Sequence, residues 1–253
     1  MIVRIGVFFV LTIFFVMLIG GVQQEVGLPD ELMVLFQWAP GIAGLLTMLI
    51  FRKRDGVRIT FFDPEMPLRR YLWAFLLPLG FGLLAFVFAL VFLGDPQSMQ
   101  LTIAGVGLMV IGALGEEIGW RGYLHKRIAP HMSGLASSLL VGVLWALFHV
   151  QYYEGGLLFM AFMALAFVSL TVMAYAALAE YEFNVLGATL FHLGINLTAA
   201  LVAGLVLSFS PSFAIAYAVI AALIAAAVVL LRRELFFNNL APAQAAPSAT
   251  LEV

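Results

Sequence analysis

The chain has 253 residues, of which 64% are apolar and only 10% are charged, and its mean hydropathy is +1.10. Water-soluble domains carry about 45–50% apolar and about 25% charged residues, so this composition indicates a polytopic membrane protein. The formal net charge of −2 argues against nucleic-acid binding, and the absence of cysteine excludes disulfides, thiolate nucleophiles and cysteine metal sites.

Apolar stretches of the length needed to cross a bilayer, about 20 residues, recur along the whole chain. They predict an all-α membrane helix bundle with about eight transmembrane helices. The predicted spans are residues 2–22, 32–51, 71–93, 101–126, 135–152, 157–179, 185–208 and 213–231. The first begins like a signal peptide, but its apolar run is long and lacks an A-x-A-like cleavage site, so we interpret it as a retained anchor.

A single helical domain is predicted for residues 1–234, and the Ala- and Pro-rich residues 235–253 are predicted to form a disordered tail. Between the second and third spans, residues 56–70 mix basic and aromatic side chains. This pattern fits either a segment lying in the membrane interface or a plain connecting loop.

Positive charges fall on one side of the predicted spans. The twelve Lys and Arg residues lie at the N-terminus, between spans two and three, at the end of span four and after span eight. The segments on the other side contain none. Because cytoplasmic segments collect positive charge, we predict that both termini are cytoplasmic, in a multi-pass protein of the cell (inner) membrane.

Ionisable residues inside span four need a physical reason, because burying a charge in a bilayer costs on the order of 3 kcal/mol. Glu117 and Arg121 are four residues apart, which favours a helical ion pair. Glu116 lies about 100° around the helix, so Arg121 cannot readily hold both acids and Glu116 is left for chemistry. Gly115 and Gly119 form a GxxxG step that permits close helix packing.

Two further pairs of polar or aromatic residues have the same helical spacing. Trp145 and His149 share a face of span five, and His192 and Asn196 share a face of span seven. Estimated depths place Glu116, His149, His192 and Asn196 within about two helical turns of each other, so a shared cavity is compatible with the sequence. A purely structural polar clamp between helices is the alternative.

His125 and His131 follow the acidic motif and are predicted to be solvated in a basic cytoplasmic loop. Neither is expected to take part in the site. The sequence has no HExxH motif, and every aspartate lies in a predicted loop, so a zincin-type site and a membrane aspartyl dyad both lack candidates.

The remaining set of one glutamate, two histidines and one asparagine has a hydrolytic use. A partly desolvated carboxylate suits a general base that takes a proton from water, and this role falls to Glu116. His149 could orient the same water, and His192 and Asn196 could donate hydrogen bonds to the oxyanion. Alternatively, Glu116, His149 and His192 could bind a catalytic zinc, the one cofactor that the sequence brings into question. A serine nucleophile is also not excluded, although no serine lies in a recognisable elbow.

Three motifs in this order resemble the CAAX prenyl endopeptidase family, also called CAAX protease and bacteriocin-processing. They are EEIGWR at 116–121, WALFH at 145–149 and FHLGIN at 191–196. The second motif usually has Phe four residues before His, where this chain has Trp145. Members of the family are polytopic intramembrane proteases, and the eight-span layout is similar.

The resemblance implies an intramembrane endopeptidase with Glu116, His149, His192 and Asn196 at the site, supported by Glu117 and Arg121. It also implies a substrate cleaved near its C-terminus, prenylated or unprenylated, and membrane lipid as the surrounding partner. Metal dependence is open between a glutamate-activated water and a metalloprotease. The alternative function is a non-catalytic binding or immunity module, or a transporter, that uses the same Glu and His cluster.

Overall fold

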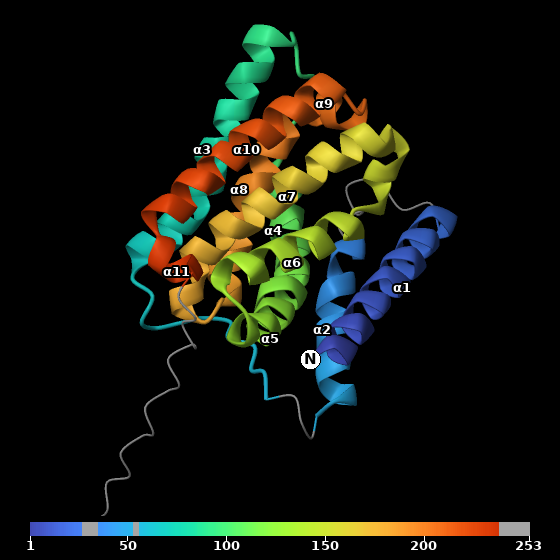
Figure 1. The fold of residues 1–253 in the computed structure, drawn as a ribbon. Coiled ribbons are helices and arrows are strands. Elements are labelled where there is room, and N and C mark those ends of the chain that lie inside the picture. Colours follow the sequence, from blue (N-terminus) through green and yellow to red (C-terminus); the bar gives the residue numbers. More distant parts are fainter. Residues whose placement is uncertain (27–34, 53–55, 238–253) are drawn as a thin grey trace, which may run out of the picture.

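The structure is a computed structural model that describes residues 1–26, 35–52 and 56–237, and these residues form helices and no strands. The all-α prediction is therefore confirmed for them (Figure 1). The longer helices are α1 (Ile2–Val26), α2 (Ala39–Ile50), α3 (Leu68–Phe92), α4 (Ile103–Gly119), α6 (Gly134–Phe148), α7 (Gly156–Leu178), α8 (Val185–Leu201) and α10 (Pro211–Leu231). Three short α-helices connect or follow them: α5 (Lys126–Ile128), α9 (Ala203–Leu207) and α11 (Arg233–Phe237). The remaining elements are a π-helix, η2 (Trp120–His125), and the 3-10 turns η3 (Ala129–His131), η4 (Val150–Gly155) and η5 (Ala179–Tyr181).

Among the described residues, five helical stretches are long and apolar enough to cross a membrane: Ile2–Gln23, Leu68–Phe92, Ile103–His131, Val150–Tyr181 and Pro211–Leu231. The other predicted spans correspond to the shorter apolar helices Leu35–Ile50, Gly134–Phe148 and Val185–Leu201. A 17-residue helix reaches only about 25 Å, less than the roughly 30 Å of a hydrocarbon core. Two of these short helices carry residues of the second and third motifs.

The helices of predicted spans five and seven are interrupted before the predicted ends, because two residues leave the helical conformation. His149 has φ −80° and ψ 64°, so α6 ends at Phe148 and not at residue 152. Val202 has φ −116° and ψ 20°, so α8 ends at Leu201 and a short α9 follows. Neither break is marked by proline.

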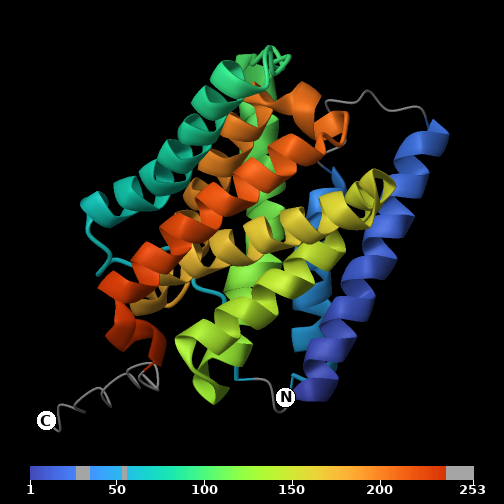
Figure 2. The ribbon, with the colours of Figure 1, turned by 45° about the horizontal axis from the view of Figure 1, so that its top comes forward.

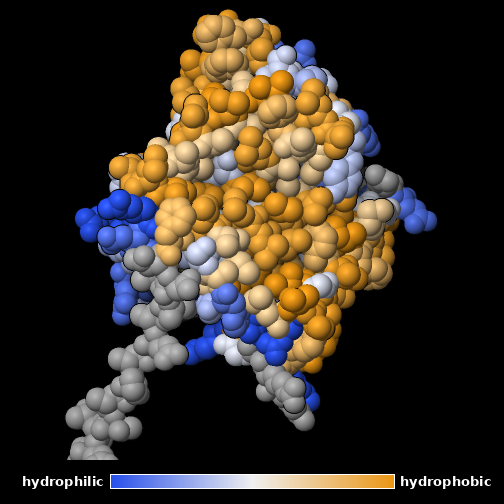
Figure 3. All heavy atoms as spheres, in the orientation of Figure 1, coloured by the Kyte–Doolittle hydropathy of each residue, from blue (hydrophilic) through white to orange (hydrophobic). Residues whose placement is uncertain are grey.

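The outer surface has the character of a lipid-facing surface. Apolar residues cover most of the visible face in Figure 3, and hydrophilic residues gather mainly towards its lower end. Large apolar side chains are exposed along α1, α3 and α10, with Phe14, Leu84 and Leu223 as examples. An exposed surface of this kind is stable in lipid and not in water, so the protein is an integral membrane protein.

Helix α4 lies inside the bundle and packs on α2 at one side and on α8 at the other, and α8 packs in turn on α3. Figures 1 and 2 both show α1 at the edge, beside α2. The predicted close approach at the GxxxG step is confirmed. A Cβ added to Gly115 would lie 2.7 Å from the Trp38 ring, and one added to Gly119 would collide with the backbone of Pro40.

Residues 56–67 form an ordered segment that is tied to the start of α8. The N–H groups of Val185 and Leu186 donate to the carbonyls of Thr60 and Phe61, at 2.8 and 3.0 Å. Phe61 is itself exposed. The segment therefore holds α8 through its backbone while presenting an aromatic side chain outward.

The helical part of the chain extends slightly past the boundary predicted at residue 234. Arg233–Phe237 form α11, and Leu235 and Phe236 are buried against the bundle. The rest of the predicted tail, residues 238–253, lies outside the described residues.

Candidate active site

The two adjacent acids lie in the last turn of α4, where it continues directly into the π-helix η2. Glu116 and Glu117 are each only 1% exposed, and Arg121 in η2 is as deeply buried. π-helical turns inside α-helices are rare and occur frequently at functional sites. Three buried ionisable groups within six residues require partners from other helices.

Glu117 is the acid that neutralises the buried cation. Its Oε1 accepts a hydrogen bond from Arg121 Nη1 at 2.8 Å, so the predicted ion pair is confirmed. The same oxygen lies 2.8 Å from Nδ1 of His192 on α8. Because a carboxylate oxygen accepts, Nδ1 is the donor in this contact, and Nε2 remains for another partner. Glu117 thus joins η2 to α8.

Glu116 has a different partner. Its Oε2 accepts a hydrogen bond of 2.9 Å from the indole Nε1 of Trp145 on α6. The face of the same indole lies under the guanidinium of Arg121, with Cζ 4.4 Å from the ring centroid. Trp145 therefore contacts both Arg121 and Glu116. Its N–H fixes one carboxylate oxygen of Glu116, while the Arg121 guanidinium is paired with Glu117.

His149 is oriented by the break at the end of α6. Its Nδ1 lies 2.8 Å from the carbonyl oxygen of Trp145, which makes Nδ1 the donor in this contact. The ring stacks on Phe167, at 4.1 Å, and on Tyr152, at 5.5 Å. A neutral imidazole held in this way keeps Nε2 as an acceptor.

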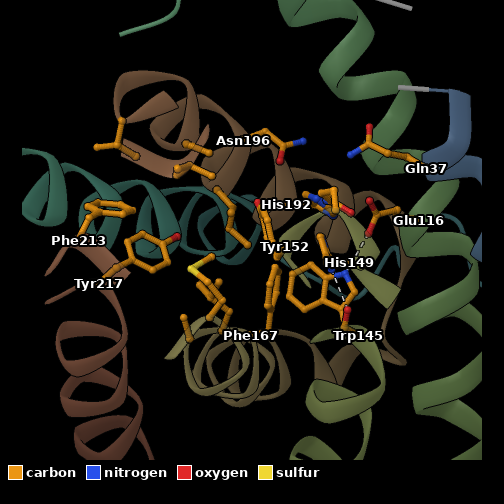
Figure 4. Close-up of a pocket in the computed structure, with 18 of the residues that line it drawn as sticks. Gln37, Glu116, Trp145, His149, Tyr152, Phe167, His192, Asn196, Phe213 and Tyr217 are labelled. Atoms are coloured by element: carbon orange, nitrogen blue, oxygen red, sulfur yellow. Dashed lines mark hydrogen bonds between the residues drawn. The ribbon is translucent and has the colours of Figure 1, made fainter. Parts of the chain in front are cut away.

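One cavity of about 140 Å³ receives Glu116, His149, His192 and Asn196. The four residues come from α4, the end of α6, and α8, and Figure 4 shows their side chains around the same space. Glu117 is not among the residues that line it. The two acids are therefore inequivalent, with Glu116 at the cavity and Glu117 behind it, as their angular separation on the helix predicts.

The lining of the cavity combines polar and apolar side chains. Gln37 and Gln151 add to the four residues above, and other parts of the wall come from α7, α9 and α10. The apolar lining consists of Phe36, Met163, Ala166, Phe167, Leu170, Ile195, Ala199, Val202, Val206 and Phe213. Figure 4 places Phe213 and Tyr217 away from Glu116, beyond Asn196. Such an arrangement suits a molecule with a polar group beside an apolar one.

Two features of this site were not predicted from the sequence. Trp145 was expected only to pack beside an imidazole, and its N–H bond to Glu116 could not be found from spacing within one helix. Gln37 is only mildly polar and was not expected at the site, yet it lines the cavity beside Glu116. Each residue nevertheless carries a polar group within an apolar stretch of the sequence, and this marks it as a candidate.

The three groups predicted as alternative zinc ligands line one cavity but do not form a metal site there. Within residues 1–26, 35–52 and 56–237, no group of three His, Asp or Glu side chains is placed to hold a metal ion. A zinc ligand set of Glu116, His149 and His192 is therefore not supported.

His125 was predicted to be solvated, and this was wrong. The helical path continues to residue 131 and turns the ring inward, where it is 0% exposed. It stacks on Phe183 with centroids 4.6 Å apart and an interplanar angle of 17°. His131 is exposed as predicted.

A comparison with protein families supports the resemblance found in the three motifs. The model of the type II CAAX prenyl endopeptidase Rce1-like family matches residues 98–198, a range that includes α4, η2, α6, α7 and most of α8. The comparison with curated proteins gives no match. The family match implies an intramembrane protease, and it covers every motif residue of the cavity but not Gln37.

Proposed function

We propose that this protein is an intramembrane endopeptidase in which Glu116 activates a water molecule for attack on a peptide bond. The observation that carries the proposal is the separation of the two acids. Glu117 is occupied by Arg121 and His192, whereas Glu116 lines the cavity and has a neutral donor, the Trp145 indole. A carboxylate without a cationic partner retains its capacity to take a proton.

In the proposed reaction, Glu116 takes one proton from water as the water oxygen bonds to the carbonyl carbon. His149, which uses Nδ1 to hold its own backbone, has Nε2 to orient this water. The carbonyl electrons move onto oxygen, and Asn196 donates a hydrogen bond to that oxyanion. His192 donates a second one through Nε2 in its imidazolium form, in which Nδ1 also donates to Glu117. When the C=O bond re-forms, the C–N bond breaks and the amine nitrogen takes the proton from Glu116.

For the substrate we propose a peptide near its C-terminus, in which an apolar group accompanies the scissile bond. The combination of polar and apolar side chains that line the cavity supports this. A volume of about 140 Å³ compares with the roughly 150 Å³ cavity that holds benzene in another protein. It accommodates one side chain, so a prenyl chain, where present, would extend beyond it.

We further propose that the chain crosses the cell (inner) membrane eight times, with both termini in the cytoplasm. The ends that carry the basic residues support this arrangement. The start of α1, the end of α2, the start of α3 and the end of α10 lie at one end of the bundle (Figure 1). The three shorter helices would then cross a membrane that is locally thinned or lie partly shielded by neighbours.

The test is cleavage by purified protein in proteoliposomes, with prenylated and unprenylated peptides and identification of the products by mass. Glu116→Gln is nearly isosteric and cannot take a proton, so we expect cleavage to fall by about 10²–10⁴-fold. Glu154→Gln, a change of the same kind at an exposed acid in η4, is the control and should cleave normally.

Full activity in folded Glu116→Gln would refute the role of this carboxylate. Cleavage of no peptide by the wild type, together with binding or transport that depends on Glu116 and His192, would instead support the alternative class of function. The two outcomes are distinguished because one has products and the other does not.

A further inference from the structure

The walls of the cavity come mainly from one end of the helix bundle. On α10, the lining residues Phe213 and Tyr217 lie within the first two turns of the helix. On α8, the lining begins at His192 in the middle of the helix and continues to Val202, directly after its last residue. Because the short α9 joins the end of α8 to the start of α10, both parts of the wall lie at the same end of the bundle.

The accessible part of the lining lies at this end as well. Gln151 is an exposed residue of η4, which joins the end of α6 to the start of α7. Asn196, in the second half of α8, and Val206, in α9, are partly exposed. Glu116 and Trp145 are each only 1% exposed. The cavity therefore runs inward from η4 and the junction of α8 and α9, and Glu116 lies at its inner end.

Packed aromatic side chains close the other end. From Glu116 the chain continues through η2 to the basic residues at the start of α5, and Figure 1 shows α5 and α9 at opposite ends of the bundle. Along η2, the side chains of Trp120, Tyr123 and His125 are each 0% exposed. Trp120 packs edge-on against Phe148, with ring centroids 5.6 Å apart, and His125 stacks on Phe183. No open path leads from the basic end to Glu116 between these described residues.

Polar contacts also tie the helix ends together at the basic end. Glu180 in η5 pairs with Arg232 after α10 at 2.7 Å and with Arg70 on α3 at 3.5 Å. Lys126 Nζ donates to the Thr60 hydroxyl at 2.7 Å. Each partly exposed contact contributes little energy by itself. Together they join the ends of α3, α7 and α10 and hold α5 to the segment before α3, so entry from this end would require several contacts to break.

We propose that the substrate reaches Glu116 from the end of the bundle opposite the basic residues, past Gln151 and the junction of α8 and α9. This inference rests on the proposed endopeptidase function and on the proposed orientation. With the basic end in the cytoplasm, the entry lies on the extracytoplasmic face of the membrane. The substrate is then a peptide segment of an exported or membrane protein at that face, and not the C-terminus of a cytoplasmic protein.

The experiment compares right-side-out and inverted membrane vesicles that contain the full-length protein. The probe is a fluorogenic peptide that carries a sulfonated dye, which keeps it outside closed vesicles. We expect right-side-out vesicles to cleave the peptide as fast as permeabilised vesicles do. Inverted vesicles should cleave it only after they are permeabilised.

The absence of cysteine from the chain allows a second, independent measurement. Gln151→Cys introduces a single thiol at the proposed entry, and Val206→Cys repeats the test should that variant fold poorly. A sulfonated maleimide added outside right-side-out vesicles should label this thiol and remove most of the cleavage that the same variant shows before labelling.

Two exposed positions outside the cavity supply matched controls. Glu25→Cys, at the end of α1, should be labelled from the same side without loss of cleavage. Arg69→Cys, at the start of α3, should be labelled only after the vesicles are permeabilised.

Cleavage by closed inverted vesicles but not by right-side-out ones would overturn the inference and leave the endopeptidase function intact. Labelling of Gln151→Cys without loss of cleavage would also overturn it. Labelling of Arg69→Cys in closed right-side-out vesicles would overturn the orientation, and the extracytoplasmic entry with it. Absence of cleavage by the permeabilised wild type would overturn the proposed function on which the inference rests.

Discussion

Replacing Trp145 by Phe removes one hydrogen-bond donor from the site and keeps an aromatic ring in the same place. The ring contacts to Phe167, at 4.8 Å, and to the Arg121 cation, at 4.4 Å, can both be made by Phe. What is lost is the 2.9 Å bond from Nε1 to Glu116. Because Phe is the usual residue at this position in the resembled motif, the variant should fold.

The size of the effect follows from the type of bond. A hydrogen bond to a charged group contributes about 1.5–3 kcal/mol, which corresponds to a fall of about 10- to 150-fold in kcat/KM if the bond orients the ionised base. The smaller ring and the loss of the hydrogen bond to a buried carboxylate should together lower the free energy of unfolding by about 2.5–4 kcal/mol. The fall in kcat/KM is therefore measured under conditions in which the variant is folded.

The assay is kcat/KM for a fluorogenic peptide in proteoliposomes, with thermal unfolding in detergent measured alongside. Trp73→Phe, on α3 with a side chain that is 63% exposed, is the control and should resemble the wild type. Folded Trp145→Phe with kcat/KM within about twofold of the wild type would refute the view that this bond orients Glu116.

Glu117→Gln should lower the free energy of unfolding by about 3–5 kcal/mol, because it leaves the buried Arg121 without its counter-charge. Denaturation in detergent measures this change, and an unchanged midpoint would contradict the ion pair. Prolonged chelation should leave the rate of cleavage unchanged, whereas a loss that added zinc restores would show that the protein binds a catalytic metal after all. The Thr60 hydroxyl donates to Glu182 and, with nearby Lys126, lowers the pKa of that carboxyl below its usual 4.5. The ionised Glu182 carboxylate therefore stabilises the folded protein above about pH 4.5, and this stabilisation is lost as the pH falls below that value. Between about pH 5 and about pH 3, the unfolding temperature should drop more for the wild type than for Glu182→Gln. Equal drops would mean that the contact contributes nothing.

Features that depend on a few neighbouring residues were predicted well from the sequence. Each apolar stretch is helical, because backbone hydrogen bonds must be satisfied within the segment when no water is available. The Glu117–Arg121 pair follows from the four-residue spacing, which helix geometry fixes. The close packing at Gly119 follows from the absence of a side chain.

Helix ends were predicted less well, since they depend on single backbone angles. His149 ends α6 without a proline, and its side-chain bond to the Trp145 carbonyl stabilises the break. The π-helix η2 inserts an irregular turn within a stretch that reads as an uninterrupted helix. No local pattern marks either feature.

The sequence by itself determined the membrane class, the helices and the small set of polar residues that lie within them. Only the tertiary structure decided which of these residues meet: His192 with Glu117, Trp145 with Glu116, and Gln37 at the same cavity. Spacing along one helix fixes the face on which a side chain lies. Which faces pack against each other depends on contacts between helices that are far apart in the sequence, so spacing within one helix cannot predict it.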